Sequence, residues 1–584
     1  MKRYLITTAL PITWPDGLKP VIFLGEWCKL YSKRSDWECF DSITFPYHWM
    51  DRVKFQKDYE FLNNLLDSEL LPEVGRNLNE IHEVNYSSDY WRILIGPWLG
   101  YFTQMVFDRF ETIRLLKEST EFSLPTKFTY ENDEVIPNDM ADFRQLFVSD
   151  YWNQYLYDQV LDFFFERPEN GSYRISRDVI TPFKMLENHK SLKEKIKNYF
   201  YSLADFCVGK TEAFFVADYL PFGDSMLLQM MLGQIPRKRR ENSIEVFELN
   251  QDLRNRWKFG NSKVDFVYLI KKLIPLQIPK VYLEGYSQLK EKPILKKWPS
   301  KPKFIFTSNS HVGDDLFKFW AAEKKESGTP LILSQHGGHY GTGMVSFLED
   351  HEKKIADRYL TWGWDDRRRK NVIPNFSVKL SKKKDIRYNS KGIGLIVENA
   401  MPRYSYLMFS ATVSSQMLEY FDDQFQFMQS LIPQIREQFT VRLYAQDFNW
   451  DQKARWKDRF PSLHYDYGQK TMKRLMEESR IYVSTYNATT FLESLGLNMP
   501  TLIFWNSNHW ELRKDATPYF EMLKEAEILF DDPAAAASHL NKIWNDISNW
   551  WNQEKRQQVR KVFLERYCRR VEHPLRTLKT NLTI

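Results

Sequence analysis

The chain has 584 residues, 43% of them hydrophobic, and this length predicts two domains rather than one compact core. Its 82 Lys and Arg against 76 Asp and Glu give a formal net charge of +6, and no stretch resembles a basic nucleic-acid-binding stripe. We therefore expect no nucleic-acid partner. Four cysteines without a CxxC spacing argue against a metal cluster or a disulfide framework, and they fit a reducing cytosol.

The N-terminus is basic and then apolar, but its apolar part is shorter than a signal-peptide core. It meets Pro11 at once, so we expect a first strand over residues 4–8 instead of a leader. No window approaches about 18 uninterrupted apolar residues. This predicts that the chain has no transmembrane helix and that any membrane contact is peripheral.

Short apolar runs bounded by turn residues predict the strands of the first half. We expect them to form one parallel sheet in a domain over residues 1–380. Between the early and the later strands, at about residues 58–207, aromatic-rich segments with helical spacing predict a large helical insertion. The predicted strands cover residues 4–8, 21–24, 213–217, 304–307, 331–334 and 359–362.

A charged stretch at residues 380–391 marks a change in composition. We interpret its Lys382 to Lys384 cluster as part of a solvated linker, with contact to an anionic membrane surface as the alternative. A second series of alternating strands and helices follows and predicts a domain over residues 381–535. The tail, residues 536–584, is helical by composition, and we expect it to pack back on the first domain. Strands of the second series are expected at residues 393–397, 439–444, 481–484 and 501–504.

The most informative motif lies at residues 484–496, where a buried strand ends in small polar residues and a helix begins. The free N–H groups and positive dipole end of that helix suit a phosphate, although polar turns also cap helices in every α/β protein. Glu493 lies one turn into the helix, where it can reach a sugar hydroxyl. The polar residues of the turn are Ser484, Thr485, Asn487, Thr489 and Thr490.

A second polar cluster follows two strands of the first domain. Asp314 and Asp315 come after one strand, and Gln335, His336, Gly337 and Gly338 come after the next. Because parallel strands end along one edge, we expect these residues to converge, together with His311 and His339. His336 can act as an acid or base near neutral pH, and the glycines permit close approach of the backbone to an anion. The alternative is that the glycines turn the chain and the aspartates open a helix.

Several familiar sites are excluded by missing motifs. The His-Gly-Gly run has no Gly-x-Ser-x-Gly elbow to make an esterase, and no HExxH or Cys/His ligand set supports zinc. The sequence also contains no P-loop, no GxGxxG fingerprint after the first strand and no Asp-x-Asp pair. We therefore expect no metal and no cofactor.

Other candidates follow strands in both domains. Glu26, Trp27 and His48 are expected to line an acceptor cleft, with a buried aromatic cluster as the alternative. Arg92 lies in an otherwise apolar helix, which indicates either a buried ion pair or an anion ligand. In the second domain, Asn399 and Arg403 follow the first strand and are expected to face the same edge as the Ser484 turn.

Two βα domains, the Ser-Thr-Tyr-Asn-Ala-Thr-Thr-Phe-Leu-Glu-Ser-Leu turn with its following proline, and the helical tail together resemble a GT-B glycosyltransferase. The resemblance implies an α/β fold of two Rossmann-like domains facing a cleft. The whole chain also resembles a family of bacterial transferases associated with surface carbohydrates. More distantly, its Gln-His-Gly and Ser-x-x-x-Thr elements are similar to those of transferases that move Kdo or related ulosonic acids from CMP.

This resemblance implies a metal-independent glycosyltransferase with a nucleotide-activated sugar donor and a glycan or glycolipid acceptor. The Ser484 turn would hold the nucleotide phosphate, Glu493 the ribose or base, and Gln335, His336 and Gly337 the sugar carboxylate or phosphate. Asp314 or Asp315 would be the catalytic carboxylate, as base or as nucleophile. We expect a cytoplasmic protein, peripheral at the inner membrane at most. The rival hypotheses are a UDP-sugar, GDP-sugar or CDP-polyol donor, or a non-catalytic glycan-binding protein.

Overall fold

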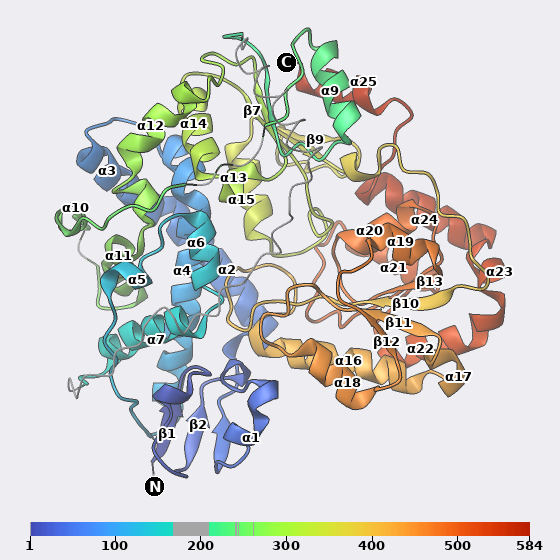
Figure 1. The fold of residues 1–584 in the computed structure, drawn as a ribbon, viewed down its shortest axis with the longest axis horizontal. Helices are drawn as coiled ribbons and strands as arrows, with labels where there is room; N and C mark the ends of the chain where they lie inside the picture. Colours follow the sequence, from blue (N-terminus) through green and yellow to red (C-terminus); the bar gives the residue numbers. More distant parts are fainter. Residues whose placement is uncertain (1, 168–208, 240–241, 243, 261, 584) are drawn as a thin grey trace.

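The computed structural model describes residues 2–167, 209–239, 242, 244–260 and 262–583, and the account that follows concerns these residues. They form three parallel β-sheets and a large set of helices (Figure 1). The helices are α1 (Arg34–Trp37), α2 (Arg52–Leu65), α3 (Leu71–His82), α4 (Ser88–Ser119), α5 (Asn132–Val135), α6 (Met140–Leu146), α7 (Asp150–Phe164), α9 (Phe222–Met231), α10 (Gln251–Asn255), α11 (Phe266–Gln277), α12 (Tyr286–Leu295), α13 (Ser310–Gly313), α14 (Asp315–Glu326), α15 (Phe347–Ile355), α16 (Met417–Ser430), α17 (Pro433–Arg436), α18 (Gln452–Arg459), α19 (Met472–Glu477), α20 (Thr489–Gly496), α21 (Thr517–Glu525), α22 (Pro533–Ile543), α23 (Ile547–Trp551), α24 (Glu554–Tyr567) and α25 (Pro574–Leu582).

The C-terminal half is built on a six-stranded parallel sheet, on the right of Figure 1. Numbered from its own first strand, the sheet has the order 3-2-1-4-5-6, which is that of a doubly wound Rossmann sheet. Such a sheet binds ligands beyond the carboxyl ends of its central strands. Its strands, in spatial order, are β12 (His464–Asp466), β11 (Phe439–Arg442), β10 (Ile393–Val397), β13 (Ser479–Ser484), β14 (Thr501–Phe504) and β15 (Leu529–Phe530).

The N-terminal half contains two parallel sheets, so the expectation of one sheet is wrong. The first and second predicted strands pair with each other in a small sheet of their own, at the lower left of Figure 1. The remaining four predicted strands belong to the other sheet. The small sheet has the order β3 (Ser42–Thr44), β2 (Val21–Phe23), β1 (Arg3–Ile6), β4 (Phe122–Ser123), and the larger has β5 (Phe214–Val216), β6 (Ile305–Thr307), β7 (Leu331–Ser334), β8 (Arg358–Thr361), β9 (Val372–Pro374). The α/β class with parallel sheets is confirmed.

Helix α4 forms the core of the N-terminal half. It is buried over most of its 32 residues and contacts α3, α7, α14 and α15. Its apolar residues lie on all sides of the helix, and buried charges such as Asp108 and Arg109 pair with each other. Two glycines one turn apart decide how closely α15 approaches. A Cβ on Gly96 would lie 2.8 Å from the His351 ring, and one on Gly100 would lie 1.9 Å from the Phe347 ring. These glycines therefore fix the position of α15 behind the candidate site.

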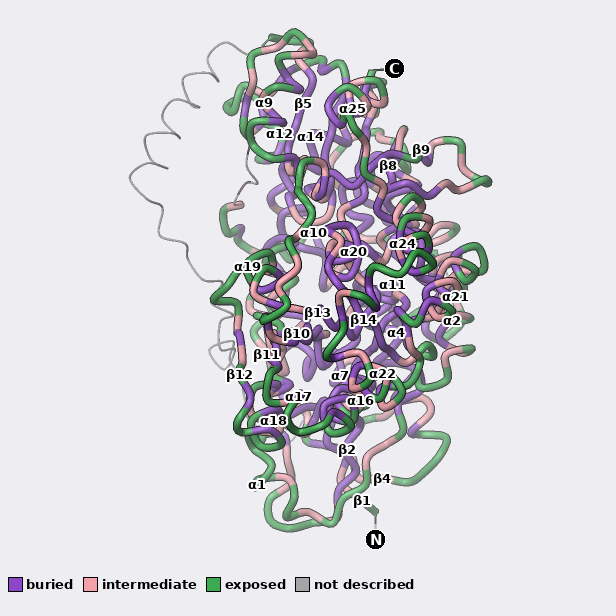
Figure 2. Tube along the Cα trace, turned by 90° about the vertical axis from the view of Figure 1, so that its right-hand side faces the viewer, coloured by how far each residue is buried: buried purple, intermediate pink, exposed green. Residues whose placement is uncertain are grey.

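The helices after β15 divide between the two halves. Helix α22 packs on α16 and β14, and α24 packs on α20 and α21, all in the C-terminal half. Helix α25 instead buries Leu578 and Leu582 in one apolar cluster with Phe306 and Ile332 of the larger N-terminal sheet. The central strands of the sheets are largely buried, whereas the edge strand β3 is mostly exposed, and exposed segments lie around the outside of the molecule (Figure 2). Among the described helices, none is long and apolar enough to cross a membrane.

Candidate functional site

The loop after β7 runs along the contact between the two halves, and Gln335 sets its path. The side-chain oxygen of Gln335 accepts hydrogen bonds from the backbone N–H of Trp362 and from the indole of Trp364, each at 2.8 Å. Its amide group donates to the carbonyl of Gly337 at 2.8 Å. Because this buried side chain is engaged within the loop, the structure favours a shaping role for Gln335 over the predicted contact with a sugar.

His336 follows in the loop, with 20% of its side chain exposed. Its Nδ1 lies 3.6 Å from Oε1 of Glu352, and its Nε2 lies 3.3 Å from the hydroxyl of Tyr340. Burial lowers the pKa of His336 to about 4. The imidazole is therefore neutral near pH 7.

Glu352 is a site residue that the sequence analysis missed. Its fully buried carboxylate accepts a hydrogen bond from Tyr340 at 3.0 Å, and Nε2 of His311 lies 3.1 Å away. Burial alone would raise the pKa of Glu352, but the neighbouring His336 and His311 lower it below its ordinary value. A negative charge thus lies behind His336. In the sequence, Glu349 and Glu352 are three residues apart and so lie on one face of a helix, and this pattern could have indicated a buried acidic pair.

The two predicted polar clusters meet at Gly338. Its backbone N–H donates to the hydroxyl of Thr489 at 3.0 Å, across the boundary between the two halves. A Cβ at position 338 would lie 2.5 Å from the carbonyl oxygen of Ala488, so only glycine permits this approach. The structure therefore brings the His336 loop against the N-terminus of α20.

Among the described residues, no side chain caps the N-terminus of α20 by a hydrogen bond. We call this helix end open for that reason. The hydroxyls around it have other partners. Thr485 donates to the carbonyl of Val397 at 2.8 Å and lies 2.6 Å from the hydroxyl of Tyr420, while Thr490 lies 2.9 Å from the hydroxyl of Tyr486. Ser484 donates to the Tyr486 carbonyl at 3.3 Å. The open groups at the predicted phosphate site are thus the backbone N–H groups of the first helical turn.

Further contacts hold the His336 loop and the C-terminal half together. Asn487 donates to the Thr342 hydroxyl at 3.3 Å. Arg513 donates to Glu349 at 2.7 Å, and Glu349 also accepts the backbone N–H of Gly341 at 2.8 Å. Burial alone would raise the pKa of Glu349, but the charges of Arg513 and Lys353 lower it to about 2. A buried ion pair therefore bridges α15 and the segment after β14.

Asp314 and Asp315 both have structural partners in the fold, and their role as catalytic carboxylates stays a prediction. Asp314 caps α14 by accepting the N–H of Phe317 at 3.0 Å, and Asn242 also donates to it. Asp315 accepts from Tyr282 at 2.5 Å and forms an ion pair with Lys318 at 2.7 Å. Both carboxylates are at most 2% exposed. The capping alternative is therefore the one that the contacts support.

Arg403 lies away from the α20 turn, in a second contact between the halves. Its guanidinium pairs with Asp150 at 2.6 Å and donates to the carbonyl of Trp27. Trp27 is buried and donates from its indole to the carbonyl of Thr7 at 3.0 Å. Glu26 forms an ion pair with Lys29 at 2.7 Å. These partners favour the alternative of a buried aromatic cluster over an acceptor cleft at Trp27, and they engage Arg403 in an ion pair.

Four remaining candidates are also placed by their contacts. His48 is buried, and its Nε2 lies 3.1 Å from Asp108, which has an ion pair with Arg109 at 2.7 Å. Arg92 pairs with Asp67 at 2.7 Å, the ion-pair alternative of the prediction. Glu493 lies 3.9 Å from Lys383 of the linker, on the C-terminal side of the open turn. The backbone N–H of Asn399 donates to Tyr420 at 2.7 Å, which places Asn399 beside the α20 turn.

Glu398 at the end of β10 is a second residue that the sequence analysis did not single out. It is 1% exposed, and neither carboxylate oxygen has a hydrogen bond of ordinary geometry to a described residue. Burial raises the pKa of Glu398 well above its ordinary value, with only the Trp456 indole acting in the opposite direction. Burial therefore favours the neutral form of this side chain at the carboxyl edge of the Rossmann sheet.

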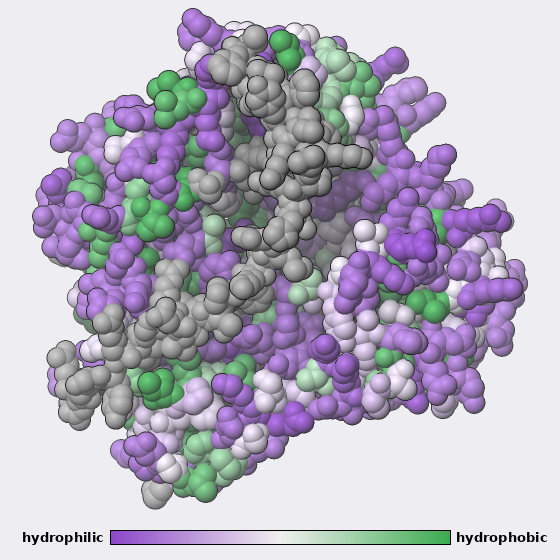
Figure 3. Space-filling view, in the orientation of Figure 1, coloured by the Kyte–Doolittle hydropathy of each residue, from purple (hydrophilic) through white to green (hydrophobic). Residues whose placement is uncertain are grey.

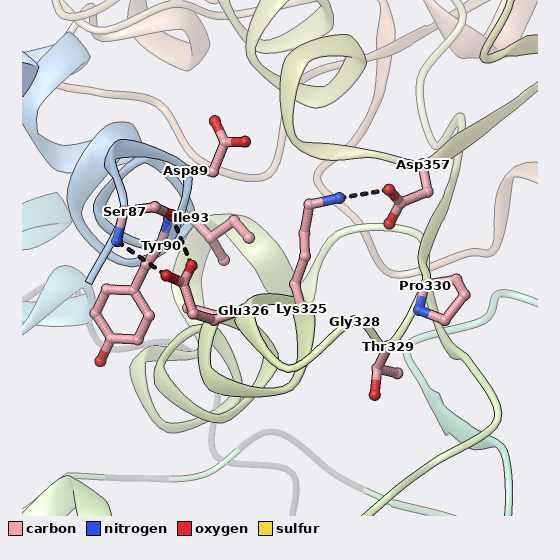
Figure 4. Close-up of a pocket in the computed structure, with 11 residues that line it drawn as sticks. Ser87, Asp89, Tyr90, Ile93, Lys325, Glu326, Gly328, Thr329, Pro330 and Asp357 are labelled. Carbon is pink, nitrogen blue, oxygen red and sulfur yellow. Dashed lines mark hydrogen bonds and ion pairs between the residues drawn. The ribbon is translucent and has the colours of Figure 1, made fainter. Parts of the chain in front are cut away.

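A pocket of about 400 Å³ elsewhere in the N-terminal half has the wrong position and chemistry for this site (Figure 4). It lies at the amino ends of β7 and β8. Three of its charged side chains already have partners, since Lys325 pairs with Asp357 at 2.6 Å and Glu326 accepts a hydrogen bond from Ser87 at 2.6 Å. In the searched part of the structure, no group of three or more His, Cys, Asp or Glu side chains is placed to hold a metal ion.

These features define a two-lobed α/β protein. The N-terminus of α20, which has no side-chain cap, meets the His336 loop of the other half, and this contact is the candidate ligand site. The chain belongs to the LIC12162 family of transferases, whose model matches residues 3–582. A comparison with curated proteins found no match. Among solved structures it is similar to WaaG, a glycosyltransferase involved in lipopolysaccharide biosynthesis, at 10% identity and a TM-score of 0.24, over 60% of this chain and 97% of that one. We conclude nothing about activity from a likeness of that size.

Proposed function

We propose that this transferase is a glycosyltransferase that moves a sugar from a nucleotide-activated donor onto a glycan or glycolipid acceptor. The contact between Gly338 and Thr489 carries the proposal, because it sets a neutral histidine beside an open helix N-terminus. A donor phosphate at that end of α20 would meet free backbone N–H groups and a favourable dipole. The same groups would stabilise the charge that develops on the leaving phosphate.

His336 takes the role of proton acceptor in this proposal, in place of Asp314 and Asp315. Like His339, it is a partly exposed titratable group of the loop. The Glu352 carboxylate behind His336 would stabilise the imidazolium that forms when the acceptor hydroxyl loses its proton. Asn487 contributes a buried side-chain oxygen that has no hydrogen bond among the described residues, so it is available to a ligand hydroxyl. Thr489, Thr490 and Glu493 keep their proposed roles around the nucleotide.

The leading donor is a CMP-linked ulosonic acid of the Kdo or nonulosonic type. A CMP donor carries a single phosphate, which one helix N-terminus and its hydroxyls can hold without a metal. The acceptor is then a bacterial surface glycan of the lipopolysaccharide, O-antigen or capsule kind, and the protein works at the cytoplasmic side of the inner membrane through peripheral contact.

Nucleotide-dependent thermal shifts test the donor. CMP, CDP, UDP and GDP are added separately to the full chain, and saturation at 100 times Kd would add about 2.7 kcal/mol to its stability. We expect CMP to stabilise wild type and to lose most of this effect in Thr489→Val. Thr580→Val, on the exposed face of α25, is the matched control and should respond as wild type.

Stabilisation by UDP or GDP without CMP would overturn the donor assignment and favour the rival nucleotide-sugar donors. No stabilisation by any nucleotide would overturn the phosphate site and favour a glycan-binding protein. Release of CMP from a CMP-activated ulosonic acid in the presence of a glycan acceptor then tests transfer. We expect His336→Gln to abolish the release while nucleotide stabilisation persists.

A further inference from the structure

Helix α9 is apolar on more than one side: Leu228 is buried in a core cluster, yet other large apolar residues of the helix face solvent. Its polar residues Asp224, Ser225 and Gln229 are buried, whereas its large apolar residues Leu227 and Met230 are 43% and 53% exposed. A helix that covers a core normally turns its apolar face inward. The outward apolar face of α9 therefore needs an explanation other than folding.

The inward polar face holds this orientation in place. Gln229 donates to the carbonyl of Arg237 at 3.0 Å and accepts the backbone N–H of the same residue at 2.9 Å. Asp224 forms an ion pair with Lys382 of the linker, and Ser225 donates to Asp218. A helix turned the other way would bury its apolar face but leave these groups without partners.

The exposed apolar surface extends beyond the helix itself. Phe222 at its start is 40% exposed and Ile235 just after its end is 50% exposed. Leu227 and Met230, three residues apart, lie between them on one face. Figure 3 shows hydrophobic atoms gathered at the top of the molecule in this region. A contiguous patch of large apolar side chains indicates an interaction surface.

Basic side chains outnumber acidic ones around this patch. Lys238 lies 5.6 Å from the Phe222 ring, and Lys379 lies 5.2 Å from the ring of Tyr219. Lys382 continues into the linker, where six cationic and two acidic side chains line a pocket of about 840 Å³. The exposed residues of α9 include no carboxylate. Apolar side chains bordered by cations complement a surface of acyl chains and anionic headgroups.

We propose that α9 and its flanking lysines dock the protein on an anionic lipid surface, with Phe222, Leu227, Met230 and Ile235 entering the interfacial region. This inference rests on the proposed function and gives its peripheral membrane contact a location, beside the larger sheet of the N-terminal half. Docking needs no nucleotide and no turnover. A failure of docking is therefore distinguishable from a failure of the proposed transfer.

Vesicle flotation with the full chain tests the docking surface. We expect wild type to float with vesicles of phosphatidylcholine and phosphatidylglycerol, and to float far less with phosphatidylcholine alone or at 1 M salt, where charges are screened within about 3 Å. Leu227→Ser with Met230→Ser should lower the partition coefficient about tenfold, since two apolar side chains no longer enter the interface. Lys238→Gln should weaken binding to the anionic vesicles alone.

The matched control is Ile294→Ser with Leu295→Ser, because these apolar side chains on α12 are 76% and 78% exposed and lie outside the patch. This variant should bind as wild type does. All of these side chains are substantially exposed, so circular dichroism should show that every variant is folded. Equal flotation of wild type and the Leu227/Met230 variant, or no flotation of wild type, would overturn the proposal. A wild-type dimer that the Leu227/Met230 variant converts to a monomer in light scattering would also overturn it, by assigning the patch to a second copy of the chain.

Discussion

Replacing Gly338 with alanine tests whether the approach of the two halves depends on the absence of a side chain. The new Cβ would lie 2.5 Å from the Ala488 carbonyl oxygen, 2.7 Å from its carbonyl carbon and 2.8 Å from Cα of Thr489. All three neighbours are backbone atoms, so no flexible side-chain end can move away. Reaching an ordinary contact of 3.4 Å requires a displacement of about 0.9 Å.

That displacement would break the hydrogen bond from the Gly338 N–H to the Thr489 hydroxyl, now 3.0 Å long. Overpacking costs about 1–3 kcal/mol and the lost hydrogen bond about 1 kcal/mol, so we expect a destabilisation of about 2–4 kcal/mol. Urea denaturation followed by tryptophan fluorescence measures this loss. The stabilisation by nucleotide should fall in the same variant, because the loop and α20 no longer meet.

Gly343→Ala is the matched control in the same loop. Its Cβ would find its nearest neighbours, Ser410 Cβ and the Val345 carbonyl oxygen, at 3.4 Å, an ordinary van der Waals distance. We expect this variant to stay within about 0.5 kcal/mol of wild type. If Gly338→Ala unfolds at the same urea concentration as Gly343→Ala and binds nucleotide equally well, the close approach of the two halves does not hold the site together.

Three further predictions concern buried titratable side chains. Asp315→Asn leaves Lys318 without its buried counter-charge, so urea denaturation should show a loss of about 3–5 kcal/mol in the free energy of unfolding. Unchanged stability together with lost turnover would instead support a catalytic role for Asp315. The folded-state pKa of His336, about 4, is below the ordinary 6.5, so the unfolded chain binds more protons between these values. Wild type should therefore lose roughly 3 kcal/mol of unfolding free energy as the pH falls through this window, and His336→Gln should lose correspondingly less. If the unfolding free energies of the two proteins change in parallel with pH, the imidazole is not held neutral by burial. Burial raises the pKa of Glu398, so above the ordinary pKa of about 4.3 the folded chain binds more protons than the unfolded chain. The free energy of unfolding should therefore fall by up to about 1.4 kcal/mol for each pH unit above that value. Glu398→Gln should remove this slope, and an unchanged slope in urea midpoints between pH 5 and 8 would show that the acid ionises in the fold.

The local pattern of the chain predicts strands well where each strand is a continuous apolar run. The runs at residues 393–397 and 501–504 coincide with β10 and β14, and the turn between β13 and α20 lies where the polar residues predict it. Short edge strands such as β12 and β15 carry too little pattern to be found. The division of the N-terminal strands between two sheets was also out of reach, because pairing between distant strands leaves no mark in the local sequence.

Candidate site residues are harder to predict than strands, since their roles depend on partners far along the chain. Asp315 follows a strand and a helix begins at it, as a catalytic carboxylate would require, yet Tyr282 and Lys318 engage it in the folded protein. Arg403 follows β10, but Asp150 of the other half holds its guanidinium. Neither contact is visible in residue type or spacing.

The convergence of the His336 loop and the α20 turn follows from sheet geometry. The position of the Glu352 carboxylate behind His336 does not. Both segments lie beyond the carboxyl ends of parallel strands, which is why the sequence could place them at ligand-binding edges. Glu352 reaches His336 from α15, and α15 lies there because Gly96 and Gly100 let it settle onto α4. A larger residue at either glycine would therefore shift the carboxylate that sets the protonation of His336, although neither glycine contacts the site. The electrostatics of the proposed transfer site would then depend on helix packing in the N-terminal core as much as on the residues at the two strand ends.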